Sequence, residues 1–142
     1  REYPERPFVG VGVVVLRGNE VLLIQRGKAP IKGQWSIPGG KQRLGETIVQ
    51  TVHRELLEET RVKIKQPALL DVVDVIIPDN KGEIQYHYTL VDYQAEWLSG
   101  ECRSGDDADA VKWVHFDELN SVGLLEITRE IILKAFSNYA MK

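Results

Sequence analysis

Three glutamates, Glu55, Glu58 and Glu59, stand within five residues of one another near the middle of the chain. Apolar residues recur at helical spacing from Ile48 to Leu57, which predicts an amphipathic helix that begins near Thr47. At about 100° per residue, Glu55 and Glu59 project beside the apolar stripe and Glu58 lies slightly further round. The three carboxylates therefore gather at the C-terminal end of the side that faces the protein interior.

Like charges three or four residues apart on a helix repel one another by a few tenths of a kcal/mol in water, and by more where water is excluded. A bound divalent cation explains such a cluster. Mg²⁺ or Mn²⁺ is favoured over zinc, because oxygen ligands suit hard ions and no Cys or His shares the spacing. The alternative is a solvated acidic face at the end of a surface helix, with Arg54 paired to Glu58.

The segment from Gly40 to Val62 resembles the Nudix box, whose pattern is G-x5-E-x7-R-E-U-x-E-E-x-G-U with U an apolar residue. The matching residues are Gly40, Glu46, Arg54-Glu55-Leu56, Glu58-Glu59 and Val62. Arg61 stands where the family has its last glycine. Since that glycine can supply a left-handed helix end, Arg61 is predicted to cost about 1 kcal/mol there or to shift the helix end.

The resemblance implies a pyrophosphohydrolase that uses Mg²⁺, with Mn²⁺ as a possible substitute. It implies metal ligation by Glu55, Glu58, Glu59 and the carbonyl of Gly40, with Glu59 as the principal ligand. Glu55 and Glu58 are also expected among the catalytic groups, and the general base is either Glu55 or an acid of the later polar loop. Asp107 is the candidate in that loop, and an exposed acid without a role is its equally weighted alternative.

Hydrolysis of a phosphoanhydride needs neutralised phosphate charge, an aligned water and an acceptor for the proton of that water. Arg54 is the fourth expected catalytic residue, and its predicted role is to orient Glu46 and Glu58 rather than to contact substrate. Lys41 follows the glycine pair and Arg26 ends a predicted strand, so both are candidate contacts for the substrate phosphates. For each of these two cations, a solvated surface position is the alternative.

The length, composition and net charge of the chain limit the class of protein to which it can belong. Its 142 residues predict a single domain over residues 1–142, and 43% hydrophobic with 27% charged residues are ordinary for a globular protein. A net charge of −3 gives no basic field for nucleic acid. Cys102 is the single cysteine, and neither a transmembrane run nor a signal peptide is evident, so a cytoplasmic location without membrane contact is expected. A homodimer is possible.

Periodicity and turn residues predict the remaining elements. A Val-rich strand buried on both faces is followed by a return strand, and the Gly39-Gly40 pair is interpreted as a turn before the acidic helix. A long hairpin, a polar loop, another strand and a closing amphipathic helix come next. The predicted ranges are 8–17, 21–24, 62–64, 69–77, 84–91 and 110–116 for strands, and 124–140 for the last helix. A mixed sheet between helices, an α/β/α sandwich of the Nudix type, is the expected fold.

The best guess for the substrate is ADP-ribose, hydrolysed to AMP and ribose 5-phosphate. It rests on Pro78, whose spacing of sixteen residues from Val62 resembles that in ADP-ribose pyrophosphatases of the family. One alternative is a MutT-like nucleoside triphosphate pyrophosphohydrolase that releases pyrophosphate. The other is a non-catalytic Nudix-fold ligand sensor, which the presence of all four box glutamates disfavours.

Overall fold

The computed structural model describes residues 1–26, 34–103 and 108–140, with the side chains of residues 108 and 109 excepted. The strands in this part of the chain are β1 (Phe8–Arg17), β2 (Glu20–Arg26), β3 (Trp35–Ser36), β4 (Gly39–Lys41), β5 (Lys63–Ile64), β6 (Ala68–Pro78), β7 (Ile84–Ser99) and β8 (Ala108–His115). The helices are α1 (Ile48–Thr60), the 3-10 helix η1 (Phe116–Ser121) and α2 (Glu126–Ala140).

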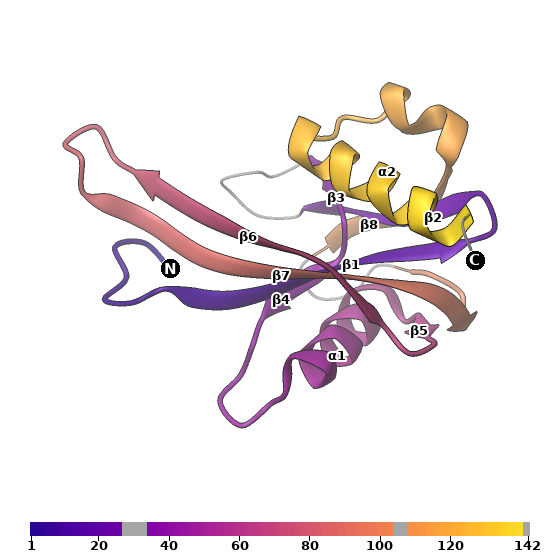
Figure 1. The fold of residues 1–142 in the computed structure, drawn as a ribbon, viewed down its shortest axis with the longest axis horizontal. Coiled ribbons are helices and arrows are strands. Elements are labelled where there is room, and N and C mark those ends of the chain that lie inside the picture. The colour runs from indigo at the N-terminus through magenta and orange to yellow at the C-terminus, as the bar shows by residue number, and fades with distance from the viewer. Residues whose placement is uncertain (27–33, 104–107, 141–142) are drawn as a thin grey trace.

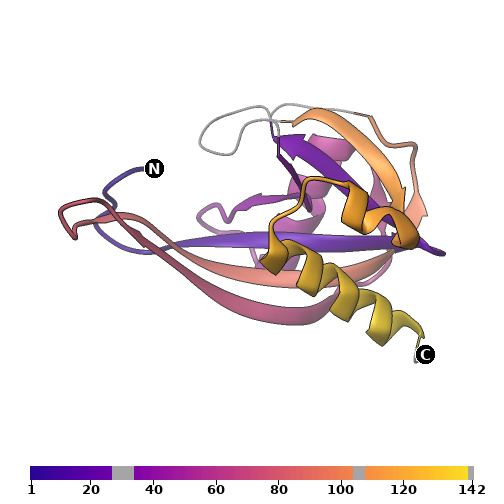
Figure 2. The same ribbon diagram turned by 90° about the horizontal axis from the view of Figure 1, so that it is seen from above.

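A mixed sheet separates the two long helices (Figures 1 and 2). β1 lies at its centre, antiparallel to β2 and β4 and parallel to β7. β6 extends the sheet beyond β7, and β8 pairs with β2 on the other side. The predicted α/β/α sandwich with a mixed sheet is confirmed.

The side chains of β1 alternate between two hydrophobic cores. Val14 packs in one core with Ile132 of α2, and Val13 packs in the other with Leu56 of α1. All four side chains are at most 1% exposed. Since full burial of such a side chain is worth roughly 1.5–3 kcal/mol, β1 holds both helices against the sheet. The prediction of a strand buried on both faces is correct.

Helix α1 begins and ends where the sequence predicts. Thr47 is the N-cap and forms a capping box with Gln50, with each side chain bonded to the backbone of the other residue. Arg61 is the C-cap and takes the left-handed conformation usually given to glycine, with φ 67° and ψ 14°. The helix end therefore does not shift, and Arg61 bears the backbone strain instead.

The interpretation of Gly39 and Gly40 as a turn is wrong. Both residues lie in β4, paired with Gly12 and Val11 of β1, and neither has a positive φ. Close packing explains why these residues are glycines. A β-carbon on Gly39 would collide with the carbonyl oxygen of Val11, and one on Gly40 would collide with the carboxylate of Glu55. The glycine pair thus brings the sheet backbone directly against α1.

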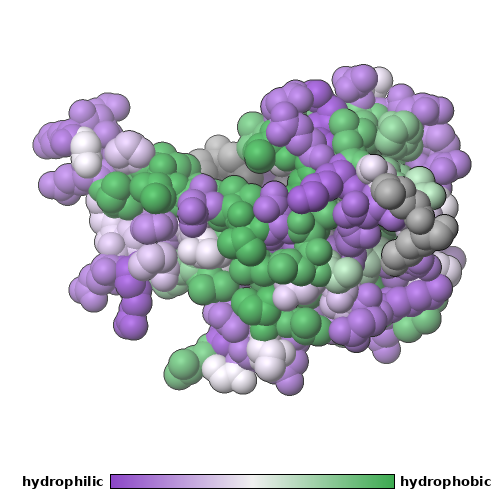
Figure 3. All heavy atoms as spheres, viewed as in Figure 1, coloured by the Kyte–Doolittle hydropathy of each residue, from purple (hydrophilic) through white to green (hydrophobic). Residues whose placement is uncertain are grey.

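The β6–β7 hairpin extends well beyond the helical layers (Figure 1). Leu69, Val72, Ile76 and Ile77 of β6 are exposed large apolar residues. Figure 3 shows apolar surface where the β6–β7 hairpin crosses this view of the molecule. Ile77 points to the opposite side of the strand from Ile76, so we call Leu69, Val72 and Ile76 the β6 apolar face. In the part of the chain that the structure describes, no helix is long and apolar enough to cross a membrane.

Candidate active site

Arg54 forms hydrogen bonds with three acidic residues of the candidate site. Its guanidinium donates to both oxygens of the Glu46 carboxylate, with Nε 2.6 Å from Oε2 and Nη2 2.9 Å from Oε1. It also donates to Glu55, to Glu58 at 3.3 Å and to the carbonyl oxygen of Lys41 at 3.0 Å. Bonding to Arg54 lowers the pKa of Glu46 to about 2, and bonding to Glu46 raises the pKa of Arg54. Arg54 thus ties the helix to the loop before it and to β4.

The carboxyl group of Glu55 lies against the backbone of Gly40, in space that any β-carbon would fill. Burial raises the pKa of Glu55, while the hydrogen bond from Arg54 opposes that change. A carboxylate whose pKa moves toward neutrality is better suited to accept a proton than an ordinary surface glutamate. These features agree with the role of general base expected for Glu55, which stays a prediction.

Glu59 is buried, with 3% of its surface exposed. The backbone N–H of Gly39 donates to its Oε1 at 2.8 Å, and the guanidinium of Arg26 donates to its Oε2 at 3.1 Å. Arg26 also reaches the carbonyl oxygen of Ile37 at 3.4 Å. The ion pair between Arg26 and Glu59 joins β2 to α1, and sequence reasoning did not foresee it.

The donor set suits a hard divalent cation. Glu55, Glu58, Glu59 and the Gly40 carbonyl supply only oxygen ligands, and Glu55 lies in contact with Gly40. Among the described residues, however, no three acidic, histidine or cysteine side chains already meet in the arrangement of a metal site. Arg54 and Arg26 balance the carboxylate charge in this structure. The residue types therefore fit a metal, and its ligation by these four residues stays a prediction.

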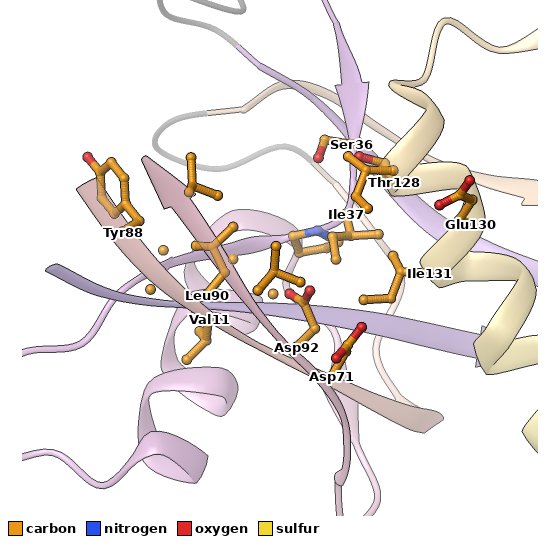
Figure 4. Close-up of a pocket in the computed structure, with 18 of the residues that line it drawn as sticks. Val11, Ser36, Ile37, Asp71, Tyr88, Leu90, Asp92, Thr128, Glu130 and Ile131 are labelled. Atoms are coloured by element: carbon orange, nitrogen blue, oxygen red, sulfur yellow. The ribbon is translucent and has the colours of Figure 1, made fainter. Parts of the chain in front are cut away.

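A pocket of about 640 Å³ lies on the other side of the glycine pair. It is formed by β1, β4, β6 and β7, by residues 36–38 and by the start of α2 (Figure 4). Gly39, Gly40, Lys41 and Arg26 line it, so the candidate phosphate contacts Lys41 and Arg26 both reach this space. Its volume is in the range of small-molecule sites, about 300–1,000 Å³. The same two glycines thus border the acidic end of α1 and a pocket of nucleotide size.

Sequence reasoning missed two acidic residues of this pocket, Asp71 on β6 and Asp92 on β7. They are directly opposite each other in the strand pair. A signal was present, because Tyr88 and Leu90 alternate along one face of the strand and Asp92 continues that face. All three residues line the pocket. Asp107, the predicted acid of the late loop, lies outside the described residues.

Comparison with known proteins identifies the class. The family model described as NUDIX domain matches residues 6–136. The chain therefore belongs to the Nudix hydrolase family, and it is a pyrophosphohydrolase of the Nudix type.

Two curated relatives are similar to this chain over most of their length. ADP-ribose pyrophosphatase of Methanocaldococcus jannaschii is 33% identical over 94% of this chain and 75% of its own. A putative 8-oxo-dGTP diphosphatase 2 of Mycobacterium tuberculosis is 35% identical over 79% and 76%.

Solved structures agree with the fold. A MutT Nudix hydrolase from Burkholderia pseudomallei has a TM-score of 0.78 and 34% identity, covering 92% of this chain and 98% of its own. The Nudix domain of NrtR from Shewanella oneidensis, crystallised with ADP ribose, has a TM-score of 0.79 and 25% identity, covering 96% and 90%. A bifunctional NMN adenylyltransferase/ADP ribose pyrophosphatase from Francisella tularensis, complexed with AMP and manganese, has a TM-score of 0.69 and 28% identity, covering 94% and 42%.

Proposed function

We propose that this enzyme hydrolyses the phosphoanhydride bond of a nucleoside diphosphate linked to another group, with ADP-ribose as substrate and AMP and ribose 5-phosphate as products. The observation that carries the proposal is the shared glycine pair. It sets the glutamates of α1 against one side of β4 and a 640 Å³ pocket against the other. The similarity to the M. jannaschii ADP-ribose pyrophosphatase over 94% of the chain supports the choice of substrate.

Under this proposal, Glu55, Glu58, Glu59 and the carbonyl of Gly40 would hold Mg²⁺ or Mn²⁺. When bound, the metal supplies neutralisation of phosphate charge and a lower pKa for the attacking water. Glu55 accepts the proton of that water, because burial already raises its pKa. Asp107 stays the alternative base.

Three cations have separate roles in the proposed site. Arg54 keeps Glu55 and Glu58 in position through its hydrogen bonds. Lys41 and Arg26 line the pocket beside the glycine pair, where the phosphate oxygens of a bound nucleotide would lie. Cations at this position would balance phosphate charge that the metal leaves uncompensated.

A MutT-like nucleoside triphosphate pyrophosphohydrolase is the second candidate. It is favoured by the M. tuberculosis relative named as a putative 8-oxo-dGTP diphosphatase, and by the MutT Nudix hydrolase from B. pseudomallei. The pocket volume accepts a nucleoside in either case. The products distinguish the two reactions, since a triphosphate would give pyrophosphate and a nucleoside monophosphate.

The decisive experiment incubates the purified protein with ADP-ribose, dGTP, 8-oxo-dGTP or NADH, with Mg²⁺ and separately with Mn²⁺, and resolves the products by ion-exchange chromatography. AMP and ribose 5-phosphate should form from ADP-ribose at the highest kcat/KM. Release of pyrophosphate from the triphosphates without AMP formation from ADP-ribose would replace the leading proposal by the second candidate.

The Glu58→Gln variant tests the proposed metal site in the same assay. Turnover should fall by at least about 100-fold, and Mn²⁺ binding, followed by electron paramagnetic resonance, should weaken. Glu58 is partly exposed, so the variant should keep the wild-type circular dichroism spectrum. Wild-type turnover and Mn²⁺ affinity in this variant would remove Glu58 from the site.

We also propose that the chain acts in the cytoplasm and pairs as a homodimer through the β6 apolar face. Exposed Leu69, Val72 and Ile76 on one side of an edge strand are an unusual concentration of apolar surface for a monomer. Light scattering coupled to size exclusion should give twice the monomer mass of 16.1 kDa. A monomer mass at micromolar concentration would contradict the pairing.

A further inference from the structure

Asp92 is a buried carboxylic acid that faces the pocket. Only 7% of its surface is exposed, and one of its oxygens, Oδ1, lies 2.5 Å from the place that a β-carbon on Gly12 would occupy. The Ile37 side chain packs over the same point at 2.8 Å. Figure 4 shows the carboxyl group of Asp92 directed toward Ile37, with Asp71 beside it. Gly12 therefore makes the room in which this carboxyl group sits.

No group in the described part of the chain donates a hydrogen bond to Asp92. The cations of the pocket are used elsewhere. Lys134 donates to the carbonyl oxygen of Leu70 at 3.0 Å, Arg26 binds Glu59, and the Lys41 ammonium lies 5.0 Å from the centre of the Phe8 ring. Asp71 accepts from the N–H of Val72 at 2.8 Å and adds negative charge rather than removing it. Buried polar side chains nearly always have a partner, because leaving one unpaired costs about 1–3 kcal/mol or more. A ligand in the pocket is the available partner.

The walls of the pocket indicate what kind of ligand group that partner belongs to. Ile37, Leu90 and Ile131 present aliphatic side chains on the same side of the sheet as the Asp92 carboxyl group (Figure 4). A planar nucleobase can place its apolar faces against such walls and direct only its polar edge at the acid. A ribose could donate a hydroxyl group to the acid, but it would bury its ring oxygen and its other hydroxyl groups against the same walls, at a desolvation cost.

We propose that Asp92 is a specificity-determining residue that accepts a hydrogen bond from the exocyclic amino group of the substrate nucleobase. The inference rests on the proposed function: Gly39 is paired with Gly12 and Gly12 with Asp92, so a nucleotide whose phosphates lie at Gly39 and Gly40 can reach Asp92 with its base across β1. A base with a hydrogen atom in place of the amino group offers the carboxylate no donor. Such a base binds more weakly, since the buried acid then stays unpaired.

Binding of AMP and of purine riboside 5′-monophosphate to the metal-free protein tests this assignment without any turnover. The two ligands differ only in the exocyclic amino group, which the second lacks, and both can be titrated calorimetrically in EDTA at pH 8. Wild-type protein should bind AMP at least about tenfold more tightly, as expected for a hydrogen bond to a charged group. In Asp92→Asn the ratio should fall below about threefold, because a neutral amide makes a weaker hydrogen bond to the amino group than a carboxylate does.

Asp74→Asn is the matched control, because Asp74 is an exposed acid of β6, the strand paired with β7, and does not line the pocket. It should keep the wild-type preference for AMP. Equal affinity of the wild-type protein for the two ligands, or an unchanged preference in a folded Asp92→Asn variant, would overturn the assignment. These outcomes do not depend on hydrolysis, so they are distinct from a failure to cleave ADP-ribose.

A second measurement needs no variant. As the pH falls from 8 to 5 the Asp92 carboxylate gains a proton and becomes a donor, so the wild-type preference for AMP over purine riboside 5′-monophosphate should shrink severalfold. The shared phosphate titrates alike in both ligands and cancels in the ratio. The other charged or titratable groups that line the pocket are Arg26 on β2, Lys41 on β4, Asp71 on β6, Tyr88 on β7, and Glu130 and Lys134 on α2. A ratio that stays constant over this range would contradict a role for Asp92.

Discussion

Replacing Asp92 with asparagine should change how the stability of the ligand-free protein depends on pH. Burial, with a smaller contribution from the negative charge of Asp71, raises the pKa of Asp92 from 3.8 to about 6 in the folded chain. Between these values the folded state binds a proton that the unfolded chain releases. Wild-type protein therefore gains stability as the pH falls through 6, and the gain is complete below 3.8.

The size of this effect follows from the two pKa values. From 3.8 to about 6 is a little over two pKa units, or about 3 kcal/mol in total at 1.36 kcal/mol per unit. About 1.4 kcal/mol of that gain falls between pH 8 and pH 5. The Asp92→Asn variant lacks the titrating group, so its stability should lack this part of the rise.

Urea unfolding followed by tryptophan fluorescence at pH 8, 6.5 and 5, with EDTA present, measures the difference. Every other side chain is the same in both proteins, so contributions common to the two cancel when the two pH profiles are subtracted. The difference in unfolding free energy between variant and wild type should change by about 1.4 kcal/mol from pH 8 to pH 5, in favour of the variant at pH 8. Parallel profiles would refute the assignment of a raised pKa to Asp92.

Three further substitutions test the box itself. Arg61→Gly should stabilise the protein by about 0.5 kcal/mol in urea unfolding without changing kcat, because relief of left-handed strain exceeds the added freedom of the unfolded chain. Gly40→Ala should lower kcat by about 100-fold, since its β-carbon displaces the Glu55 carboxylate, whereas Gly123→Ala, which meets open space, should leave kcat unchanged. Arg54→Lys should reduce kcat by about tenfold or more, because an ammonium group cannot bridge three carboxylates as the planar guanidinium does.

The elements that depend on local signals could be predicted from the sequence. The capping box of Thr47 and Gln50 fixes the start of α1, and the helical spacing of its apolar residues places Glu59 on the buried side. Val-rich β1 and the hairpin of β6 and β7 also have clear local patterns. The order of these elements then leaves few ways to assemble a mixed sheet between two helices.

Features that depend on distant segments could not be derived in the same way. A glycine pair such as Gly39 and Gly40 usually predicts a turn, whereas here the neighbouring backbone of β1 and the Glu55 carboxylate leave no room for a side chain at either position. The ion pair between Arg26 and Glu59 depends on how α1 packs against β2. Neither contact has a local sequence signal.

The parallel pairing of β1 and β7 also bears on the order in which the molecule can fold. Nine registered pairs run from Phe8 with Tyr88 to Leu16 with Glu96, so each joins residues far apart in the chain. Such distant contacts form late, because the loop between them must close first. A nascent chain that ends after α1 already contains every glutamate of the box but leaves one edge of β1 unpaired and its apolar side chains open to aggregation. The active site can therefore be completed only after β7 has paired with β1. The same strand carries Asp92.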